Sequence, residues 1–248
     1  MFIIIIKIIV ISDQVNDITA DEVEDHYYLS TYIKINSNLI NDIINLENMV
    51  KKLTNDQKEV TDYIKKNIDN QMLIFLSGER GCGKTYLVNI IYNMLLMNGL
   101  GVKKLATTGY AATLIDGQTI HSYFTINHLL KCSLQYDSSN WHSIKQTNVI
   151  IIDECSLMSD ELLNLIDEIL NRINYDNNTN KSIIPSKFGN KSIILVGDLL
   201  QLSAVSTFYK PITQLYKSLL FKDNFIPFIL STNMRAINDK LYCAFLSK

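Results

Sequence analysis

The segment GERGCGKT, from Gly78 to Thr85, matches the spacing G-x-x-x-x-G-K-[ST] in full. Small residues let backbone N–H groups close around a phosphate, and the start of the following helix adds its positive dipole end. Lys84 can reach the β- and γ-phosphates of a nucleotide, and the Thr85 hydroxyl can ligate Mg²⁺. The odds of a chance match are well under about one in a hundred. The segment predicts a nucleotide site formed by Gly78, Gly81, Gly83, Lys84, Thr85 and the variable position Cys82.

A second candidate for chemistry is the acid pair Asp153-Glu154, which ends the apolar run Val149 to Ile152. The carboxyl ends of parallel strands face the ligand crevice of such sheets. Asp153 would hold Mg²⁺, directly or through water, and Glu154 would orient and deprotonate the attacking water. The alternative is a pair of acids at the start of the next helix, where acids are favoured. The phosphate loop in the same chain favours the catalytic interpretation.

Gln57 has two interpretations that the sequence alone does not separate. Thr54-x-x-Gln57 is the pattern of a capping box that begins a helix. A glutamine amide can equally bond N6 and N7 of adenine together. In the second case Gln57 would contact the base of the bound nucleotide.

The elements that must position these residues alternate along the chain. Apolar runs predict strands, and apolar residues at helical spacing predict helices. We expect strands over 2–11, 72–76, 102–106, 149–152, 193–196 and 225–230, helices over 38–51, 55–69, 87–95 and 162–173, and loops over 13–25 and 174–186. This alternation predicts an α/β fold with a mostly parallel sheet and helices on both faces.

Composition narrows the class of protein. The 248 residues are 47% hydrophobic and 19% charged, which excludes a disordered tail, a collagen-like rod and a disulfide miniprotein. The net charge of −2 does not indicate a basic nucleic-acid binder, although a groove needs only local Lys and Arg. Four scattered cysteines without a C-x-x-C pair indicate an intracellular, reducing compartment. The run 2–11 is shorter than the roughly 20 residues that span a bilayer, so we expect no membrane partner.

The motifs stand in an order that resembles the Pif-one-like DNA helicases of superfamily 1B, including the helicase module of Helitron-type transposons. The resemblance covers about residues 50–247 and implies a RecA-like P-loop NTPase fold. It is carried by blocks similar to the Q motif (Leu53 to Gln57), motif I (Gly78 to Thr85), motif Ia (Thr107 to Ala112 and Gly117 to Ser122), motif II (Asp153 to Met158), the turn before motif III (Phe188 to Lys191), motif III (Gly197 to Leu202) and motif IV (Leu230 to Ala236).

The resemblance implies an ATP-dependent DNA helicase that moves 5′→3′ on single-stranded DNA, its partner, with ATP as substrate and Mg²⁺ as cofactor. Gln201 would sense the γ-phosphate, and Arg235 would place a cation against it as charge develops, so the catalytic set is Lys84, Glu154, Gln201 and Arg235. Hydroxyls, a backbone N–H and a histidine would line the single-strand path without reading bases, at Thr108, Gly109, Thr119 and His121. For His121 a helix-start or core position has equal weight. We expect a monomer, nuclear if the source is eukaryotic.

The sequence also departs from the family pattern. Ala204 replaces the usual Pro of motif III, and Lys187 and Asn190 replace Pro and Gly in the preceding turn; these changes spare the chemistry. We divide the chain into an N-terminal extension, residues 1–50, and one RecA-like domain, residues 51–248. Motifs V and VI, which bring an arginine finger worth about 10³–10⁵ in rate, are not found before Lys248.

We therefore expect a truncated copy of the motor that binds Mg-ATP weakly, hydrolyses it slowly and does not unwind duplex DNA. The alternatives are a nucleotide-binding or regulatory module without motor activity, and another additional-strand P-loop ATPase. Roles in repair, recombination, telomere maintenance and transposition remain equally open on the sequence.

Overall fold

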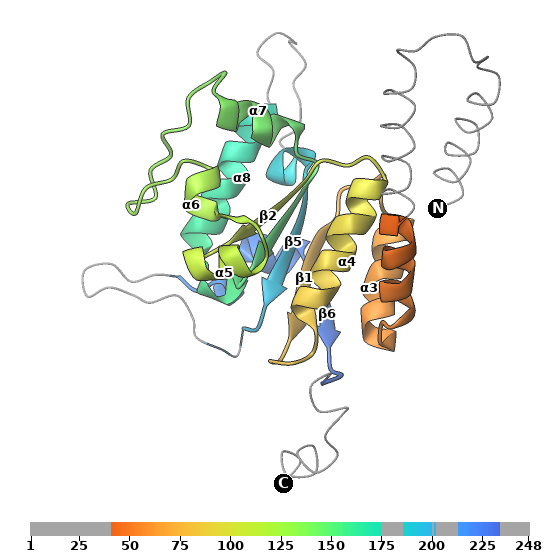
Figure 1. Ribbon diagram of the computed structural model, residues 1–248. Helices are drawn as coiled ribbons and strands as arrows, with labels where there is room; N and C mark the ends of the chain where they lie inside the picture. The colour runs from red at the N-terminus through yellow and green to blue at the C-terminus, as the bar shows by residue number, and fades with distance from the viewer. Residues whose placement is uncertain (1–40, 175–185, 200, 202–212, 234–248) are drawn as a thin grey trace, which may run out of the picture. The chain divides into compact units, whose positions relative to one another are not determined.

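The computed structural model describes residues 41–174, 186–199, 201 and 213–233 (Figure 1). The chain divides into two units, Met1–Leu53 and Thr54–Lys248. The described part of the first unit contains a helix over residues 41–51, within the helix predicted over 38–51. The strand predicted over 2–11, the loop over 13–25 and nearly all of the loop over 174–186 lie outside the described residues. Everything below concerns the second unit.

The second unit is built on a six-stranded parallel sheet with the strand order β3-β2-β4-β5-β1-β6. Its strands are β1 (Leu73–Gly78), β2 (Val102–Ala106), β3 (Gln118–Thr119), β4 (Val149–Asp153), β5 (Ser192–Gly197) and β6 (Ile226–Leu230). Five of these confirm predicted strands to within two residues at either end; β3 was not predicted. Since all neighbours are parallel, every strand ends at the same edge of the sheet.

Helices cover both faces of this sheet, which confirms the predicted α/β class. The helices are α3 (Asn55–Lys66), α4 (Lys84–Met97), α5 (Gly109–Leu114), α6 (Ile120–Tyr123), α7 (Ser139–Gln146), α8 (Asp160–Asn174) and α9 (Leu219–Asn224), with 3-10 turns at Cys155–Leu157, Lys187–Asn190 and Leu215–Lys217. Figure 1 shows α3 and α4 on one side of the sheet and α6, α7 and α8 on the other. Among the described residues, no helix is long and apolar enough to cross a membrane.

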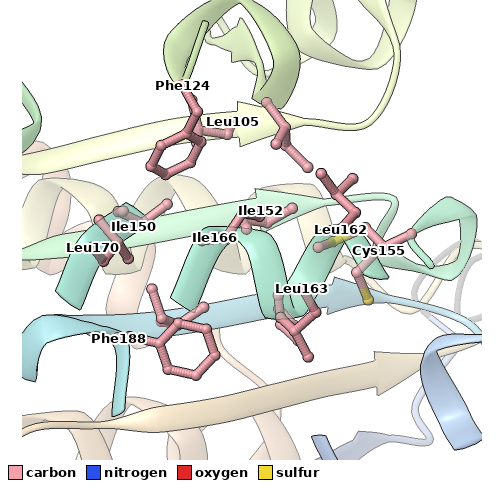
Figure 2. Close-up of a cluster of buried hydrophobic side chains, with 14 of the residues drawn as sticks. Leu105, Phe124, Ile150, Ile152, Cys155, Leu162, Leu163, Ile166, Leu170 and Phe188 are labelled. Carbon is pink, nitrogen blue, oxygen red and sulfur yellow. The ribbon is translucent and has the colours of Figure 1, made fainter. Parts of the chain in front are cut away.

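The core explains why β4 reads as an uninterrupted apolar run. Ile150 and Ile152 point to the face covered by α8, where they join Leu162 and Ile166 in one buried cluster (Figure 2). Ile151, between them, is equally buried on the opposite face. A strand covered on both faces needs apolar residues at every position, and each fully buried side chain of this size contributes about 1.5–3 kcal/mol. The core therefore holds the carboxyl end of β4, and the acids that follow it, in a fixed place.

Helix α3 ends at Lys66, three residues before the predicted end at residue 69. The Asn67 side-chain amide donates to the Tyr63 carbonyl at 2.9 Å, and the Asn67 backbone N–H bonds to the Tyr63 and Ile64 carbonyls. Asn competes well for backbone groups at helix ends. The apolar residues at helical spacing therefore continue to Ile68, two residues beyond the end of the helix at Lys66.

Candidate nucleotide and nucleic-acid site

The carboxyl edge of the sheet carries most of the residues singled out by the sequence. In the strand register Thr119 lies beside Ala106, and Ala106 lies beside Asp153. On the far side, Gly78 at the start of the phosphate loop lies beside Leu230. The order along the edge is therefore the candidate DNA contacts, then the acid pair, then the phosphate loop. This is the edge at which parallel sheets bind ligands.

The phosphate loop, Gly78–Thr85, has the backbone that its glycines predict. Gly81 and Gly83 have φ of 90° and 81°, a region that side chains with a Cβ rarely adopt. Gly78 is needed for space, because a Cβ there would lie 2.5 Å from the Cys82 sulfur and 3.0 Å from the Leu230 carbonyl oxygen. The loop then opens directly into the 14-residue helix α4 at Lys84. The strand, loop and helix thus stand in the context that a phosphate site requires.

Lys84 folds back over this loop. Its ammonium group donates to the carbonyl oxygens of Gly78 at 2.6 Å and Glu79 at 3.1 Å, so the cation sits at the loop itself. The neighbouring Thr85 is exposed. Cys82 is buried, and that burial raises the pKa of its thiol. The cysteine is consequently a poor nucleophile, which agrees with its role as a variable position.

The two acids after β4 occupy different environments. An Asp153 carboxylate oxygen accepts a hydrogen bond from the Glu154 backbone N–H at 2.9 Å. Burial raises the pKa of Asp153, the Glu154 charge adds to the rise, and the Glu154 N–H and the Lys84 charge oppose it. Glu154 has a left-handed backbone, with φ 53° and ψ 41°, and its side chain makes no capping bond to the turn that follows. The Glu154 side chain therefore does not cap the turn that follows it, as the alternative interpretation would require.

Mg²⁺ fits the donor atoms at this edge. Among the described residues, no group of three or more His, Cys, Asp or Glu side chains could hold a metal by itself. Mg²⁺ at a nucleotide needs fewer, because it binds through one or two protein oxygens together with phosphate oxygens and water. The Asp153 carboxylate and the Thr85 hydroxyl supply such oxygens. A cation beside Asp153 would also offset the burial that disfavours its ionised form.

Gln57 forms a capping box with Thr54, as one of its two interpretations predicts. Its Oε1 accepts a hydrogen bond from the Thr54 N–H at 3.1 Å, and its Nε2 donates to the Cys82 carbonyl at 3.0 Å. The side chain is only 1% exposed. Both ends of the amide are therefore bound to protein atoms, and one of them is in the phosphate loop. The contact between Gln57 and adenine stays a prediction.

Two candidate catalytic residues come from motifs III and IV. The structure describes Gln201 of motif III, whereas Arg235 of motif IV lies outside the described residues. The Gln201 side-chain amide donates to Asp198 at 2.8 Å, and Asp198 is itself buried just beyond β5. Gln201 is thus held beside the same carboxyl edge as the acid pair. Its role as a γ-phosphate sensor stays a prediction.

The candidate DNA contacts, Thr108, Gly109, Thr119 and His121, are referred to below as the DNA strip. Thr108 and Thr119 are the N-caps of α5 and α6, and their hydroxyls accept from the backbone N–H groups of Ala111 and Ser122, each at 3.2 Å. His121 is half-buried in the short helix α6. Nothing lies within 4 Å of the position that a Cβ at Gly109 would occupy. Packing in this fold therefore gives no reason for a glycine at that position.

Three residues with suggestive contacts were not singled out as site residues by the sequence. Tyr110 follows Gly109 and is 78% exposed. The Thr107 hydroxyl, one residue before the DNA strip, donates to the Glu154 carbonyl of the acid pair at 3.1 Å. Asp56 accepts backbone N–H groups from residues 231 and 232. Exposure of Tyr110 follows from no motif, and the other two contacts join residues far apart in the chain.

Comparisons with known proteins identify the family and the fold of this chain. A family model described as PIF1-like helicase matches residues 52–243. ATP-dependent DNA helicase PIF1 of Trypanosoma brucei brucei is 30% identical over 170 residues, which cover 68% of this chain and 16% of that protein. The crystal structure of Pif1 helicase from Candida albicans has a TM-score of 0.64 at 25% identity, covering 79% of this chain and 43% of that one.

A second solved structure, Pif1 helicase from Bacteroides in complex with ADP-AlF3 and ssDNA, has a TM-score of 0.61 at 24% identity and covers 74% of this chain and 43% of that one. These likenesses confirm the predicted RecA-like α/β fold. The chain spans less than half the length of each of these three proteins.

Proposed function

The chain belongs to the PIF1-like helicase family, and on this premise we propose that residues 51–248 form the first motor domain of an ATP-dependent DNA helicase. The domain binds and hydrolyses Mg-ATP at the phosphate loop and contacts single-stranded DNA along the DNA strip, with movement in the 5′→3′ direction. One observation carries the proposal: the phosphate loop, the acid pair and the DNA strip stand in sequence along a single edge of the sheet.

The chain's own residues account for the hydrolytic chemistry. The backbone N–H groups of the phosphate loop hold the β-phosphate, and Lys84 turns from the loop carbonyls toward the β- and γ-phosphate oxygens. Asp153 and Thr85 would hold Mg²⁺, which when bound supplies positive charge that offsets the negative charge on those oxygens. Glu154 orients the attacking water and takes its proton. Gln201, whose amide is hydrogen-bonded to Asp198 just beyond β5, would sense the γ-phosphate.

Support for the DNA strip comes from two of its residues and one neighbour. No atom lies within 4 Å of the position that a Cβ at Gly109 would occupy, so a phosphate has space to approach the backbone there, and backbone contacts of this kind hold nucleic acid without reading sequence. Tyr110 presents an exposed ring, and rings of this kind stack on bases of any sequence. The Bacteroides Pif1 named above is complexed with ssDNA, which supports the same partner for this chain.

A hydrogen bond gives the two halves of the site a physical connection. The Thr107 hydroxyl donates to the Glu154 carbonyl, so a shift of the strip on DNA binding is passed to the residue that positions water. Coupling of this kind is what a DNA-stimulated ATPase requires.

The test is ATP hydrolysis by the purified chain with and without single-stranded DNA. We expect slow hydrolysis that DNA accelerates several-fold, and no strand displacement on a forked duplex. Measurable strand displacement would contradict the expectation that this chain carries only part of a motor.

A second candidate function is a nucleotide-binding module without motor activity. It is favoured by the observation that the Thr108 and Thr119 hydroxyls are already engaged as helix caps. ATP binding with hydrolysis indifferent to DNA would support this candidate over the motor.

A further inference from the structure

Asp56, in the first turn of α3, has its two carboxylate oxygens bound to different parts of the chain. Oδ1 accepts hydrogen bonds from the Thr54 hydroxyl and from the Gln57 backbone N–H. Oδ2 accepts from the backbone N–H groups of Ser231 at 2.9 Å and Thr232 at 3.1 Å. The first pair of bonds stays within one helical turn. The second pair joins α3 to the chain where it leaves β6, 175 residues further on.

Gln57, the next residue, makes a second long-range tie, to the phosphate loop. Its Nε2 donates to the Cys82 carbonyl at 3.0 Å, and the buried amide is held from behind by the Thr54 N–H. Two consecutive residues of one helical turn therefore hold the phosphate loop and the segment after β6. Neither tie is needed to begin the helix, because the capping bonds of α3 are made by other atoms.

The phosphate loop and the end of β6 also touch directly. Gly78 pairs with Leu230 in the strand register. A Cβ at Gly78 would lie 3.0 Å from the Leu230 carbonyl oxygen and 2.5 Å from the Cys82 sulfur. The Leu230 carbonyl and the Cys82 sulfur therefore leave no room for a side chain at Gly78, and segments with so little free space between them do not move independently. A change in the loop is therefore felt at Leu230, one residue before the amides that Asp56 holds.

The Asp56 carboxylate stays charged while it makes these bonds. Burial alone would raise its pKa, but hydrogen bonds from the Thr54 hydroxyl and from the Thr232, Ser231 and Gln57 amides outweigh burial and lower the pKa to about 2. Hydrogen bonds to an ionised acceptor are roughly twice as strong as neutral ones. The tie between α3 and the segment after β6 is consequently at full strength at neutral pH.

We propose that Asp56 is a positioning residue that couples the phosphate loop to the segment leaving β6, so that nucleotide in the loop fixes the path of the chain at Ser231 and Thr232. The proposal rests on the proposed function, because it requires nucleotide binding at the loop. It goes beyond that function in assigning the coupling to one carboxylate. In the sequence, Arg235 follows three residues after Thr232.

The experiment measures amide hydrogen exchange at Ser231 and Thr232 in the 248-residue chain, with and without Mg-ADP. In the wild-type chain we expect both amides to be protected and their exchange to slow further when Mg-ADP binds. In Asp56→Asn we expect exchange about tenfold faster and no response to Mg-ADP, with ADP affinity lowered several-fold. The matched control is Asp62→Asn, which removes an exposed acid of the same helix that pairs with Lys65 and should behave as wild type.

A second variant, Thr232→Pro, removes one donor at the other end of the tie and leaves α3 intact. We expect it to lower ADP affinity in the same direction as Asp56→Asn. Faster exchange in Asp56→Asn with an unchanged response to Mg-ADP would show that Asp56 only stabilises the fold. That result would overturn the proposed coupling between the phosphate loop and the segment after β6. Unchanged exchange in the absence of nucleotide would show that the tie itself does not form. A wild-type chain that binds no ADP would instead refute the proposed function, and this outcome is distinct from both.

Discussion

The phosphate loop and the DNA strip lie at one edge of one sheet, but they are held in place differently. The loop is fixed by residues distant in sequence: Gln57 bonds the Cys82 carbonyl, and Leu230 packs against Gly78. The strip is fixed locally, since Thr108 and Thr119 each bond an amide three residues further on. The fold thus shapes the loop before any ligand arrives. In the strip, by contrast, the fold accounts for the caps and leaves Gly109 and Tyr110 to be explained by a partner.

The largest effect is expected at Glu154, which lies between the phosphate loop and the DNA strip. Because Glu154 is proposed to act on water and not on the phosphates, its loss should greatly lower hydrolysis and spare ATP binding. An amide cannot take a proton from water, so Glu154→Gln should lower single-turnover ATP hydrolysis by about 10²–10⁴-fold and leave ATP affinity unchanged. Rapid-quench measurements on the purified chain test this, with the exposed Glu168→Gln of α8 as control. Hydrolysis at the wild-type rate in Glu154→Gln would place the general base elsewhere.

Substitution of Lys84 should have the opposite effect, because it should weaken ATP binding. Loss of charge-assisted bonds to the phosphates in Lys84→Ala should weaken ATP binding by about 10–100-fold, as calorimetry would measure. Lys222→Ala, which removes an exposed lysine of α9, is the matched control. If ATP binds equally well without the Lys84 ammonium, the phosphates do not lie on this loop.

The same contrast explains how much the sequence could predict. The strand at 149–152 was located to within a residue because a strand buried on both faces is an uninterrupted apolar run. The phosphate loop was located because its glycines, Lys84 and Thr85 are neighbours in the chain. Local patterns of this kind are legible without knowledge of tertiary structure.

Tertiary ties were not legible in the same way. Asp56 meets Ser231 only because β6 packs beside β1, 175 residues away in the chain. For Gln57 the sequence offered two roles, and the structure shows the capping box together with a bond to the loop that neither role contained. The short elements β3, α5 and α6 carry too few residues for periodicity to reveal them.

Gly109 in the DNA strip and Gly117 near it test the same comparison through smaller effects. A Cβ at Gly117 would lie 2.6 Å from the Lys104 carbonyl oxygen, whereas a Cβ at Gly109 would meet nothing. Gly117→Ala should therefore lower the free energy of unfolding by about 1–3 kcal/mol. Gly109→Ala should leave it unchanged or raise it by up to about 1 kcal/mol and weaken single-stranded DNA binding several-fold.

Denaturant unfolding and fluorescence anisotropy with a labelled oligonucleotide test this pair of variants. If Gly109→Ala binds DNA as wild type does, the DNA does not occupy the open space at Gly109. The DNA strip would then be a set of helix caps only.

The smallest effect concerns two acids whose pKa values are shifted in opposite directions. For Asp56 the folded pKa of about 2 lies below the unfolded value near 3.8, so its contribution to stability is present above pH 4 and is lost as pH falls toward 2. For Asp153 burial raises the pKa, so its ionised form opposes folding at neutral pH. Asp56→Asn should therefore lower the free energy of unfolding at pH 7 by roughly 1 kcal/mol, and Asp153→Asn should leave it unchanged or raise it.

Chemical denaturation of the nucleotide-free chain between pH 7 and pH 3 separates the two acids. The difference between wild type and Asp56→Asn should shrink as pH falls below 4, because protonation removes the charge that the amides hold. Asp153→Asn should keep or improve stability, while Mg²⁺-dependent hydrolysis should be lost. This is the pattern expected of a carboxylate that binds a ligand and destabilises the fold when no ligand is bound. Equal destabilisation by both variants at pH 7 would mean that Asp153, like Asp56, serves the fold.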